Sequence, residues 1–469
     1  MILFRTPSVG LFAMACALSA CTTLQPDGGI APVQQTARER LGKDLKLARS
    51  AADDEAISRR VGELLAPPLT ADAAVQIALL NNRGLQASLH DLGIADAELV
   101  QASRLPNPGF SIGRLKRGSE REIERTLSFG LGHLLALPWS REVEARRLQA
   151  VQHSVTLEML SLAAQTRQAW TTALAAEQSL HYMEQVERAA QAGATLAARM
   201  QQAGNFSKLQ QMREQSFQAD AALGLARARQ AKVAARERLT RLLGLSGASP
   251  TFVLPDRLPD LPQTPAEQPD VEKVALTQRL DVQAARAQAD ATAKNLGLTR
   301  VTRFVNVLEF SAMHNTSNEA PRQTGYEIGF EIPLFDWSGA RVARAEATYM
   351  QSVHRAAQAA IDARSEVREA YQGYRSAWDI ARRYRDEIVP TAKSIADENL
   401  LRYNGMFIGV FELLADARTQ IATVNASIEA LRDFWLAQAA LEMALVGKPT
   451  LPAPASTAAA AATGAGPAH

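Results

Sequence analysis

The chain has 469 residues, with 51 basic and 49 acidic side chains, 6% aromatic residues and two cysteines. A net charge near zero argues against a nucleic-acid partner, which usually requires a strong basic excess. Two cysteines exclude a disulfide scaffold and a cysteine-rich metal site. After the first 20 residues no uncharged apolar stretch is long enough for a membrane helix, which excludes a polytopic helical membrane protein.

Residues 1–20 have the pattern of a secretory signal. Arg5 precedes an apolar run from Val9 to Leu18, which is too short to span a bilayer. The run ends in Leu18-Ser19-Ala20-Cys21, which resembles the lipobox of bacterial lipoproteins, in which the cysteine is acylated and becomes the new N-terminus. Thr22 after that cysteine implies delivery to the outer membrane. The alternative is an ordinary secretory signal followed by a chance cysteine.

The rest of the chain divides into two similar halves. A polar leader, extended or partly helical, covers 21–68, and a Pro-rich linker at 250–270 separates the halves 69–249 and 271–447. The tail, 448–469, is rich in Ala, Pro and Gly and is predicted to be disordered. Matching segments recur at offsets that drift slowly from 197 to 203, as expected for a duplication with small insertions: Leu85-Gln86-Ala87 with Val282-Gln283-Ala284, Gly204 with Gly405, and Leu243-Gly244 with Val446-Gly447.

Each half is predicted to begin with one helix, at 70–104 and 272–300, the first capped by Thr70. Long helices follow at about 139–245 and 337–447, with turns near Gly204 and Gly405 and a kink or interruption at Pro390. From Leu148 onward, apolar residues, many of them Ala, recur at 3-4 spacing, which predicts a closely packed left-handed coiled coil. A dimeric cytoskeletal-type coiled coil is the alternative, and the strands and the duplication speak against it.

Each half also holds a predicted β-hairpin, at about 108–135 and 303–334. Apolar residues alternate with small or polar ones in Leu127–Leu131 and Tyr326–Ile332. We expect Gly109–Leu115 and Phe304–Ala312 as their partners, with loops at Gly118–Glu124 and Asn315–Gln323. A small soluble sheet packed on the helices is one interpretation. A lipid anchor favours a membrane barrel, which four strands cannot close, because the known minimum is about eight. Several chains would then share one barrel.

The chain resembles the outer-membrane efflux protein (TolC-like) family, in its lipoprotein branch, over about residues 65–447. The stretches that carry the resemblance are Leu69-Thr70 to Asn81-Asn82, Leu85-Gln86-Ala87, Ala102 to Pro106-Asn107-Pro108, Ala203-Gly204, Pro333-Leu334-Phe335-Asp336 with Arg341, and Arg402-Tyr403-Asn404-Gly405. The resemblance implies a homotrimer with a shared barrel of about 12 strands in the outer membrane and a long α-helical tunnel in the periplasm. It also implies two partners, a periplasmic adaptor and an inner-membrane pump, and no catalysis.

The helix tips depart from the family pattern. The family often has an Asp six residues after the turn glycine, where this chain has Gln210 in the first copy and Phe411 in the second. Glu412 and Asp416 follow at i, i+4 spacing and share a helix face. Repeated around a three-fold axis, they would form a ring of charge that selects cations and gates. The alternatives are that both are solvated surface acids, or that Phe407 and Phe411 close the pore.

Two further departures fall at helix joints. Arg83 follows the two asparagines where the family often has Pro, and Leu280 stands in Arg279-Leu280-Asp281 where Arg-Pro-Asp is common. No catalytic constellation, spaced metal-ligand set, cofactor motif or nucleotide-binding loop is present in the sequence. The sequence therefore predicts a passive exit duct of a tripartite efflux system, lipid-anchored in the outer membrane. The rival hypothesis is a periplasmic structural or adaptor lipoprotein with a coiled coil and no pore. The cargo is not readable from the sequence.

Overall fold

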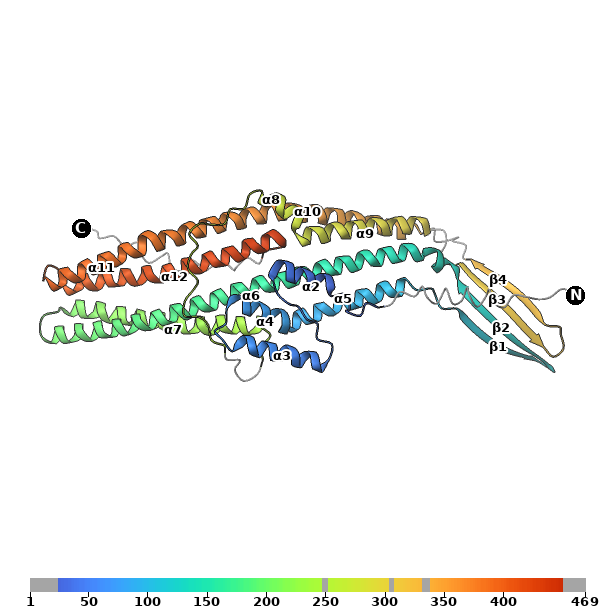
Figure 1. The fold of residues 1–469 in the computed structure, drawn as a ribbon, viewed down its shortest axis with the longest axis horizontal. Coiled ribbons are helices and arrows are strands. Elements are labelled where there is room, and N and C mark those ends of the chain that lie inside the picture. Colours follow the sequence, from blue (N-terminus) through green and yellow to red (C-terminus); the bar gives the residue numbers. More distant parts are fainter. Residues whose placement is uncertain (1–23, 247–251, 303–307, 331–337, 450–469) are drawn as a thin grey trace. The chain divides into compact units, whose positions relative to one another are not determined.

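The structure, a computed structural model, describes residues 24–246, 252–302, 308–330 and 338–449 (Figure 1). The signal peptide, Cys21 and tail residues 450–469 lie outside these ranges. The leader contains α2 (Ala31–Thr36), the π-helical turn η1 (Ala37–Leu41) and α3 (Ala51–Leu65). The first half contains α4 (Ala71–Asn81), α5 (Arg83–Ala102), β1 (Gly109–Arg117), β2 (Glu120–Gly130), α6 (Leu131–Gln202) and α7 (Lys208–Leu242). The second half contains α8 (Val271–Gln278), α9 (Leu280–Thr302), β3 (Leu308–Ser317), β4 (Gln323–Phe330), α10 (Gly339–Arg383), the π-helical turn η2 (Tyr384–Ile388), α11 (Val389–Asn404) and α12 (Val410–Val446).

The same order of helices, hairpin and long helices in both halves confirms the predicted fold class, mainly α with a small β part. The chain forms two compact units. The sheet unit is made of the described residues within Met1–Asp54, Arg83–Met159 and Leu276–Asp362, and the helical unit of those within Glu55–Asn82, Leu160–Ala275 and Ala363–His469. Among the described residues, no helix has an apolar stretch long enough to cross a membrane.

The first helix of each half is divided in two, where the sequence predicts one continuous helix. Thr70 caps α4 as predicted, because its Oγ1 accepts a hydrogen bond of 3.1 Å from the Ala73 N–H. The helix then ends at Asn82, whose backbone is extended, with ψ of 117°. In the second half the break falls at Arg279, whose buried guanidinium binds Asp281 with two hydrogen bonds of 3.0 and 2.6 Å. Both departures from the family pattern thus lie at these joints.

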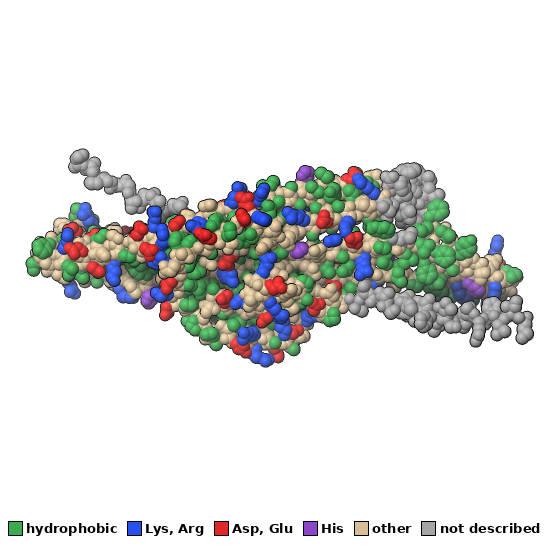
Figure 2. Space-filling view, turned by 45° about the horizontal axis from the view of Figure 1, so that its top comes forward, with side chains coloured by type: hydrophobic (Ala, Val, Ile, Leu, Met, Phe, Trp, Pro, Cys, Tyr) green, Lys and Arg blue, Asp and Glu red, His purple; other side chains and the backbone are tan. Residues whose placement is uncertain are grey.

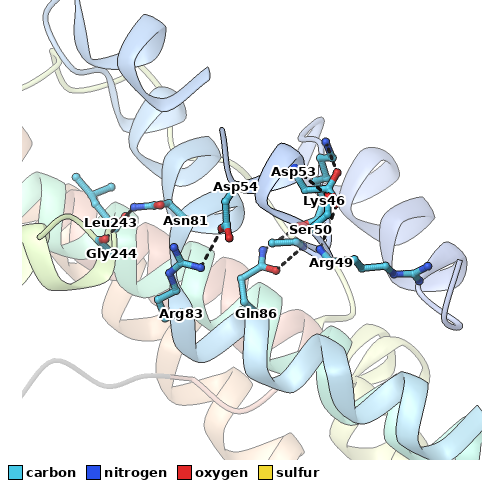
Figure 3. A network of polar contacts seen from close by, with 11 residues as sticks. Lys46, Arg49, Ser50, Asp53, Asp54, Asn81, Arg83, Gln86, Leu243 and Gly244 are labelled. Carbon is cyan, nitrogen blue, oxygen red and sulfur yellow. Dashed lines mark hydrogen bonds and ion pairs between the residues drawn. The ribbon is translucent and has the colours of Figure 1, made fainter. Parts of the chain in front are cut away.

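Two asparagine side chains account for the first break. Asn81 Nδ2 donates to the carbonyls of Leu243 and Gly244 at 3.0 and 2.8 Å (Figure 3). Asn82 Nδ2 donates to the Leu242 carbonyl at 3.0 Å. These bonds satisfy carbonyls that the end of α7 leaves without helical partners. Gly244 is required there, because its φ is +65° and an added Cβ would lie 2.4 Å from the Asn81 carbonyl oxygen.

The long helices follow the predicted pattern with one shift. The hairpin predicted over 108–135 ends at Gly130, and α6 begins at Leu131, so Pro138 lies inside the helix. Most of the predicted seam is buried, including Met159, Ala173 and Ala197. Thr166, a polar member of the seam, is fully buried and donates its hydroxyl to the Leu162 carbonyl at 2.7 Å. The helix therefore keeps its polar seam residue without losing a hydrogen bond.

The interruption predicted at Pro390 is the π-helical turn η2, which ends two residues before that proline. Proline cannot donate a backbone hydrogen bond inside a helix. A single wide turn before it lets the chain continue as α11, with the proline in the first turn. The helix therefore continues without a break from α10 through η2 into α11, and the wide turn takes the place of the predicted interruption.

Three indole side chains bind backbone carbonyls within the helical unit, and two of these carbonyls, of Pro259 and Pro262, belong to the Pro-rich linker. Trp170 Nε1 donates to the Leu69 carbonyl at 2.7 Å, Trp378 Nε1 to Pro262 at 3.1 Å, and Trp435 Nε1 to Pro259 at 3.1 Å. Trp378 also belongs to the core of α10 and α12, beside Phe434. Trp170 and Trp378 are both buried. Each combines apolar packing with one satisfied N–H.

Candidate functional site

A four-stranded antiparallel sheet in the order β1-β2-β3-β4 is the first candidate site. The two hairpins meet at β2 and β3, where Arg125 lies opposite His314. The outer edges of β1 and β4 have no partner strand among the described residues. The turns are shorter than predicted. Glu120–Glu124 lie in β2 and Asn315–Ser317 in β3, because polar residues can occupy strands when neither face of the sheet is buried.

The register separates the side chains of the sheet by chemistry. Residues directly opposite each other point to the same face. One face, here called the apolar face, carries Phe110, Ile112, Leu127, Phe129, Phe310, Ala312, Tyr326 and Ile328. The other, the carboxylate face, carries Glu120, Glu122, Glu124, Glu309 and Glu327, mostly among Ser, Thr, Gly and Asn, together with Leu115, Met313, Arg117 and Gln323. In the space-filling view hydrophobic side chains gather over the strands, on the right (Figure 2).

The apolar face is exposed, which makes it a surface that needs a partner. Phe110 is 67% exposed and Tyr326 is 74% exposed. Phe310 and Tyr326 stack with ring centroids 6.4 Å apart. Contiguous exposed apolar surface of this kind marks an interaction site for protein or membrane. The strands have 8 to 11 residues, close to the 9–11 that a tilted membrane strand requires.

The tips of the two long helical hairpins are the second candidate site. In the first tip, Gly204 has φ of +80°, and the Asn205 N–H donates to the Met200 carbonyl at 2.9 Å. Together these form a Schellman turn with glycine at its left-handed position. Ser207 then caps α7, with a reciprocal bond from its own N–H to the Gln210 side chain.

The second tip has the same turn, displaced by one residue from the predicted match. Gly405 has φ of −81°, and the positive φ, +63°, falls on Met406. The Phe407 N–H donates to the Arg402 carbonyl at 2.9 Å, and Gly409 takes the cap position of Ser207. The counterpart of Gly204 is therefore Met406, not Gly405. With this register Glu412, not Phe411, occupies the position of Gln210.

The predicted gate residues do not share one environment. Phe407 is 84% exposed beside the turn. Glu412 is exposed in the first turn of α12, whereas Asp416 is half-buried and accepts a hydrogen bond from Asn399 of α11. Phe411 lies in α12, but its side chain is outside what the structure describes. The structure thus leaves Glu412 as the free carboxylate of the pair and ties Asp416 to the neighbouring helix.

A buried ion pair near the tips was missed from the sequence. Glu214 of α7 is only 2% exposed, and its Oε1 lies 2.6 Å from Arg418 Nη2 of α12. The Arg418 guanidinium also lies 4.4 Å above the Phe217 ring. A signal was present, because Glu214, Ala221 and Leu225 follow the 7-4 spacing of a buried seam. A charge at such a position predicts a partner on the facing helix.

The leader is bound along α5 through buried polar groups. Gln86, 6% exposed, accepts from the Ala48 N–H at 3.0 Å and donates to the Lys46 carbonyl at 2.8 Å (Figure 3). Lys46 and Ser50 bind the Asp53 carboxylate and lower its pKa to about 2. Arg83 pairs with Asp54 at 3.1 Å. These contacts fix the leader to α5 from Lys46 to Asp54. The predicted lipidation site, Cys21, lies outside the described residues.

Among the described residues, no group of three or more His, Cys, Asp or Glu side chains is placed to hold a metal ion. The two candidate sites of the described residues are therefore the sheet, with its apolar and carboxylate faces, and the tips of the two helical hairpins.

No model of a known protein family matches the chain. A curated relative, the cobalt-zinc-cadmium resistance protein CzcC of Cupriavidus metallidurans, is 29% identical over 279 residues, covering 57% of this chain and 63% of the relative. The chain therefore matches less than two thirds of that relative's length.

Solved structures match more of the chain. CusC is 19% identical with a TM-score of 0.65, covering 80% of this chain and 92% of CusC. The MtrE outer-membrane channel of Neisseria gonorrhoeae, in its open state, is 18% identical with a TM-score of 0.63, covering 83% of this chain and 89% of MtrE. This chain has the fold of these channels, and the resemblance indicated by its sequence is confirmed.

Proposed function

We propose that three copies of this chain form the outer-membrane exit duct of a tripartite efflux system. The observation that carries the proposal is the sheet, with one exposed apolar face, one carboxylate face and two open edges. An open edge is too costly in lipid, because its backbone groups stay unpaired. Three sheets joined edge to edge would supply about 12 strands, which is within the range of closed membrane barrels.

The match over most of the length of CusC and MtrE supports the duct over a coiled-coil adaptor without a pore. In this proposal the barrel lies in the outer membrane, acyl chains on Cys21 add an anchor, and the long helices form a periplasmic tunnel. A periplasmic adaptor and an inner-membrane pump are its partners. The duct catalyses no reaction, and the pump supplies the energy.

Divalent metal cations are the cargo we propose to test first. CzcC is named for resistance to cobalt, zinc and cadmium. A conduit that passes cations needs negative charge along its wall rather than a tight chelating site, because tight binding would hold the ion. Deleting the gene should sensitise the host to these metals, and unchanged growth in their presence would redirect the search to other cargo.

The tip turns, Gly204 and Met406, would form the periplasmic end, and Glu412 is the proposed gate carboxylate. Three copies of Glu412 around the axis would form a ring of negative charge. Replacing Glu412 with Ala should raise single-channel conductance or lower the preference for cations, measured in planar bilayers. Asp416→Ala is the comparison, since Asp416 is already bound to Asn399. If Glu412→Ala had the same conductance and the same cation preference as the parent, the hypothesis of an acidic gate would be refuted.

Conductance of the purified full-length protein in planar bilayers tests the function itself. We expect discrete channel openings and a trimeric mass by native mass spectrometry. A homogeneous trimer that forms no pores would refute the duct.

A further inference from the structure

The apolar face of the sheet carries a cluster of cations at its hairpin end. Arg114, Lys116, Arg121 and Arg125 all point to this face, as the register requires. Lys116 lies directly opposite Arg121, and Arg114 is diagonal to both Arg121 and Arg125. We call these four residues the basic cluster.

The basic cluster has no internal neutralisation. Within the described residues, none of its members lies within ion-pair distance of a carboxylate, and Arg125 reaches only the Thr316 hydroxyl, at 3.4 Å. The neighbouring acids, Glu122 and Glu124, point to the opposite face. Like charges directly opposite on a strand pair destabilise it. An anion between Lys116 and Arg121 would remove this repulsion.

The position of the basic cluster identifies the anion. The long helices join the strands at the end opposite the β1–β2 turn, so helices in the periplasm put that turn on the outer side. Eight residues separate Phe129 from Arg121 along β2, which is about 27 Å of strand. With a tilt of about 45°, Arg121 and the opposite Lys116 lie roughly 20 Å above the row of Phe129, near the outer boundary of the hydrocarbon layer. Arg125, opposite Ile112, lies roughly 10 Å lower on the same face.

We propose that the basic cluster binds phosphate-bearing headgroups of lipids in the outer leaflet, an inference that rests on the proposed membrane function. Three guanidinium groups and one ammonium match phosphate oxygens in charge and geometry. The apolar residues below the cluster, Phe110 and Leu127, would contact the acyl chains of the same lipid. The carboxylates remain on the other face, where they do not repel the headgroup.

The test uses the full-length trimer in nanodiscs of phosphatidylcholine with or without a bis-phosphorylated glycolipid, lipid A. Native mass spectrometry counts the glycolipid molecules retained per trimer. In the triple variant Arg114→Gln/Lys116→Gln/Arg121→Gln, the number of lipid A molecules retained per trimer should fall by a factor of about ten or more. Each basic residue near an anionic surface raises the binding constant about fivefold. Arg117→Gln is the matched control, because Arg117 neighbours Lys116 in β1 but points to the carboxylate face. It should retain lipid A like the parent.

Two further arms isolate charge and folding. Dephosphorylated lipid A should be retained poorly by every variant, and Arg114→Lys/Arg121→Lys should restore most of the binding. Lys116→Gln alone, with an expected loss of about fivefold, serves if the triple variant does not trimerise. Equal retention by parent and triple variant, equal loss in Arg117→Gln, or equal retention of the dephosphorylated lipid would overturn the proposal.

Pore formation in phosphatidylcholine bilayers is recorded for each variant as a separate measurement. If the parent forms channels and the triple variant retains less lipid A than the parent, both proposals are supported. If the parent forms channels and both proteins retain lipid A equally, only the lipid site is overturned. A parent protein without channels refutes the duct whatever the lipid count.

Discussion

At the scale of single residues, the two tip turns form a natural matched pair. Gly204 and Met406 hold the same left-handed position, but only glycine adopts it without a steric cost. Met406→Gly should stabilise the second tip by about 1 kcal/mol, and Gly204→Ala should destabilise the first by a similar amount. Hydrogen exchange of the amides at the ends of α11 and α12 should slow about fivefold in Met406→Gly.

Gly405→Ala is the control for this pair, because Gly405 has an ordinary negative φ. An added Cβ would lie 2.8 Å from the movable Phe407 ring and at ordinary contact distance, 3.5 Å, from the Leu401 carbonyl oxygen. Gly405→Ala should change exchange at the tip much less than Gly204→Ala does. If Gly405→Ala changed exchange at its tip as much as Gly204→Ala does, Gly405 rather than Met406 would be the position of the second turn that requires glycine.

The tips also show what residue patterns can predict. The sequence predicts a turn at each tip, and both are found. It pairs Gly204 with Gly405 because glycine is the usual residue at positive φ. The structure instead keeps two residues between the left-handed position and the next helix cap, which is Ser207 after Gly204 and Gly409 after Met406. The distance along the chain to the next helix cap therefore sets which residue takes the left-handed position. In the second tip that residue is Met406, where sequence matching expects a glycine.

At the scale of helices, the Glu214–Arg418 pair links α7 to α12. Because Glu214 is buried, Arg418→Met would leave a carboxylate without its partner, which costs about 3–5 kcal/mol at buried sites. We expect looser packing of α12, seen as faster hydrogen exchange in its first turns and as more frequent channel opening.

Arg402→Met is the matched control, since the Arg402–Glu398 pair lies on one helix and both side chains are more than half exposed. Such pairs contribute about 0–1 kcal/mol. If both variants left exchange and channel opening unchanged, the buried pair would have no role in holding the helices.

The sheet yields a second prediction at this scale. If its carboxylate face lines the duct, replacing Glu124, Glu309 and Glu327 by Gln should reduce cation preference. The reversal potential across a salt gradient in planar bilayers measures this preference, which should move toward zero. Glu319→Gln, beyond the end of β3, is the control. A potential that moved equally in the control would place the selective charge elsewhere.

Alternation predicted these strands well but not their length. Leu127–Leu131 and its partner were identified because apolar residues repeat every second position. Glu120–Glu124 and Asn315–Ser317 were expected as loops, since polar runs usually leave a sheet. Here they continue the ladder, because the carboxylate face has no core to exclude them. The helix breaks at Asn82 and Arg279 depend on contacts with distant or buried groups, so local periodicity could not set them.

At the scale of the whole molecule, the duplicated plan explains how a chain of ordinary composition could supply the proposed membrane barrel. Each copy contributes one hairpin, and the two hairpins pair through β2 and β3. A shared barrel would therefore need only four strands from each chain. Most of the other described residues form helices, and α6 packs through a seam rich in Ala. The low aromatic content, 6%, is consistent with helices that pack through Ala-rich seams.

The two proposed membrane attachments can be separated by one substitution. Cys21→Ala should remove the acyl chains, visible in the intact mass of the mature protein. Buried acyl carbons contribute about 0.8 kcal/mol each to membrane attachment, but a closed barrel is held by its own apolar face. The variant should therefore lose the lipid mass and still form pores once inserted. Ser19→Ala is the control, because it leaves the cysteine intact. An unchanged mass in Cys21→Ala would exclude lipidation at this site. Loss of pores from a correctly assembled trimer would show that the barrel depends on the anchor.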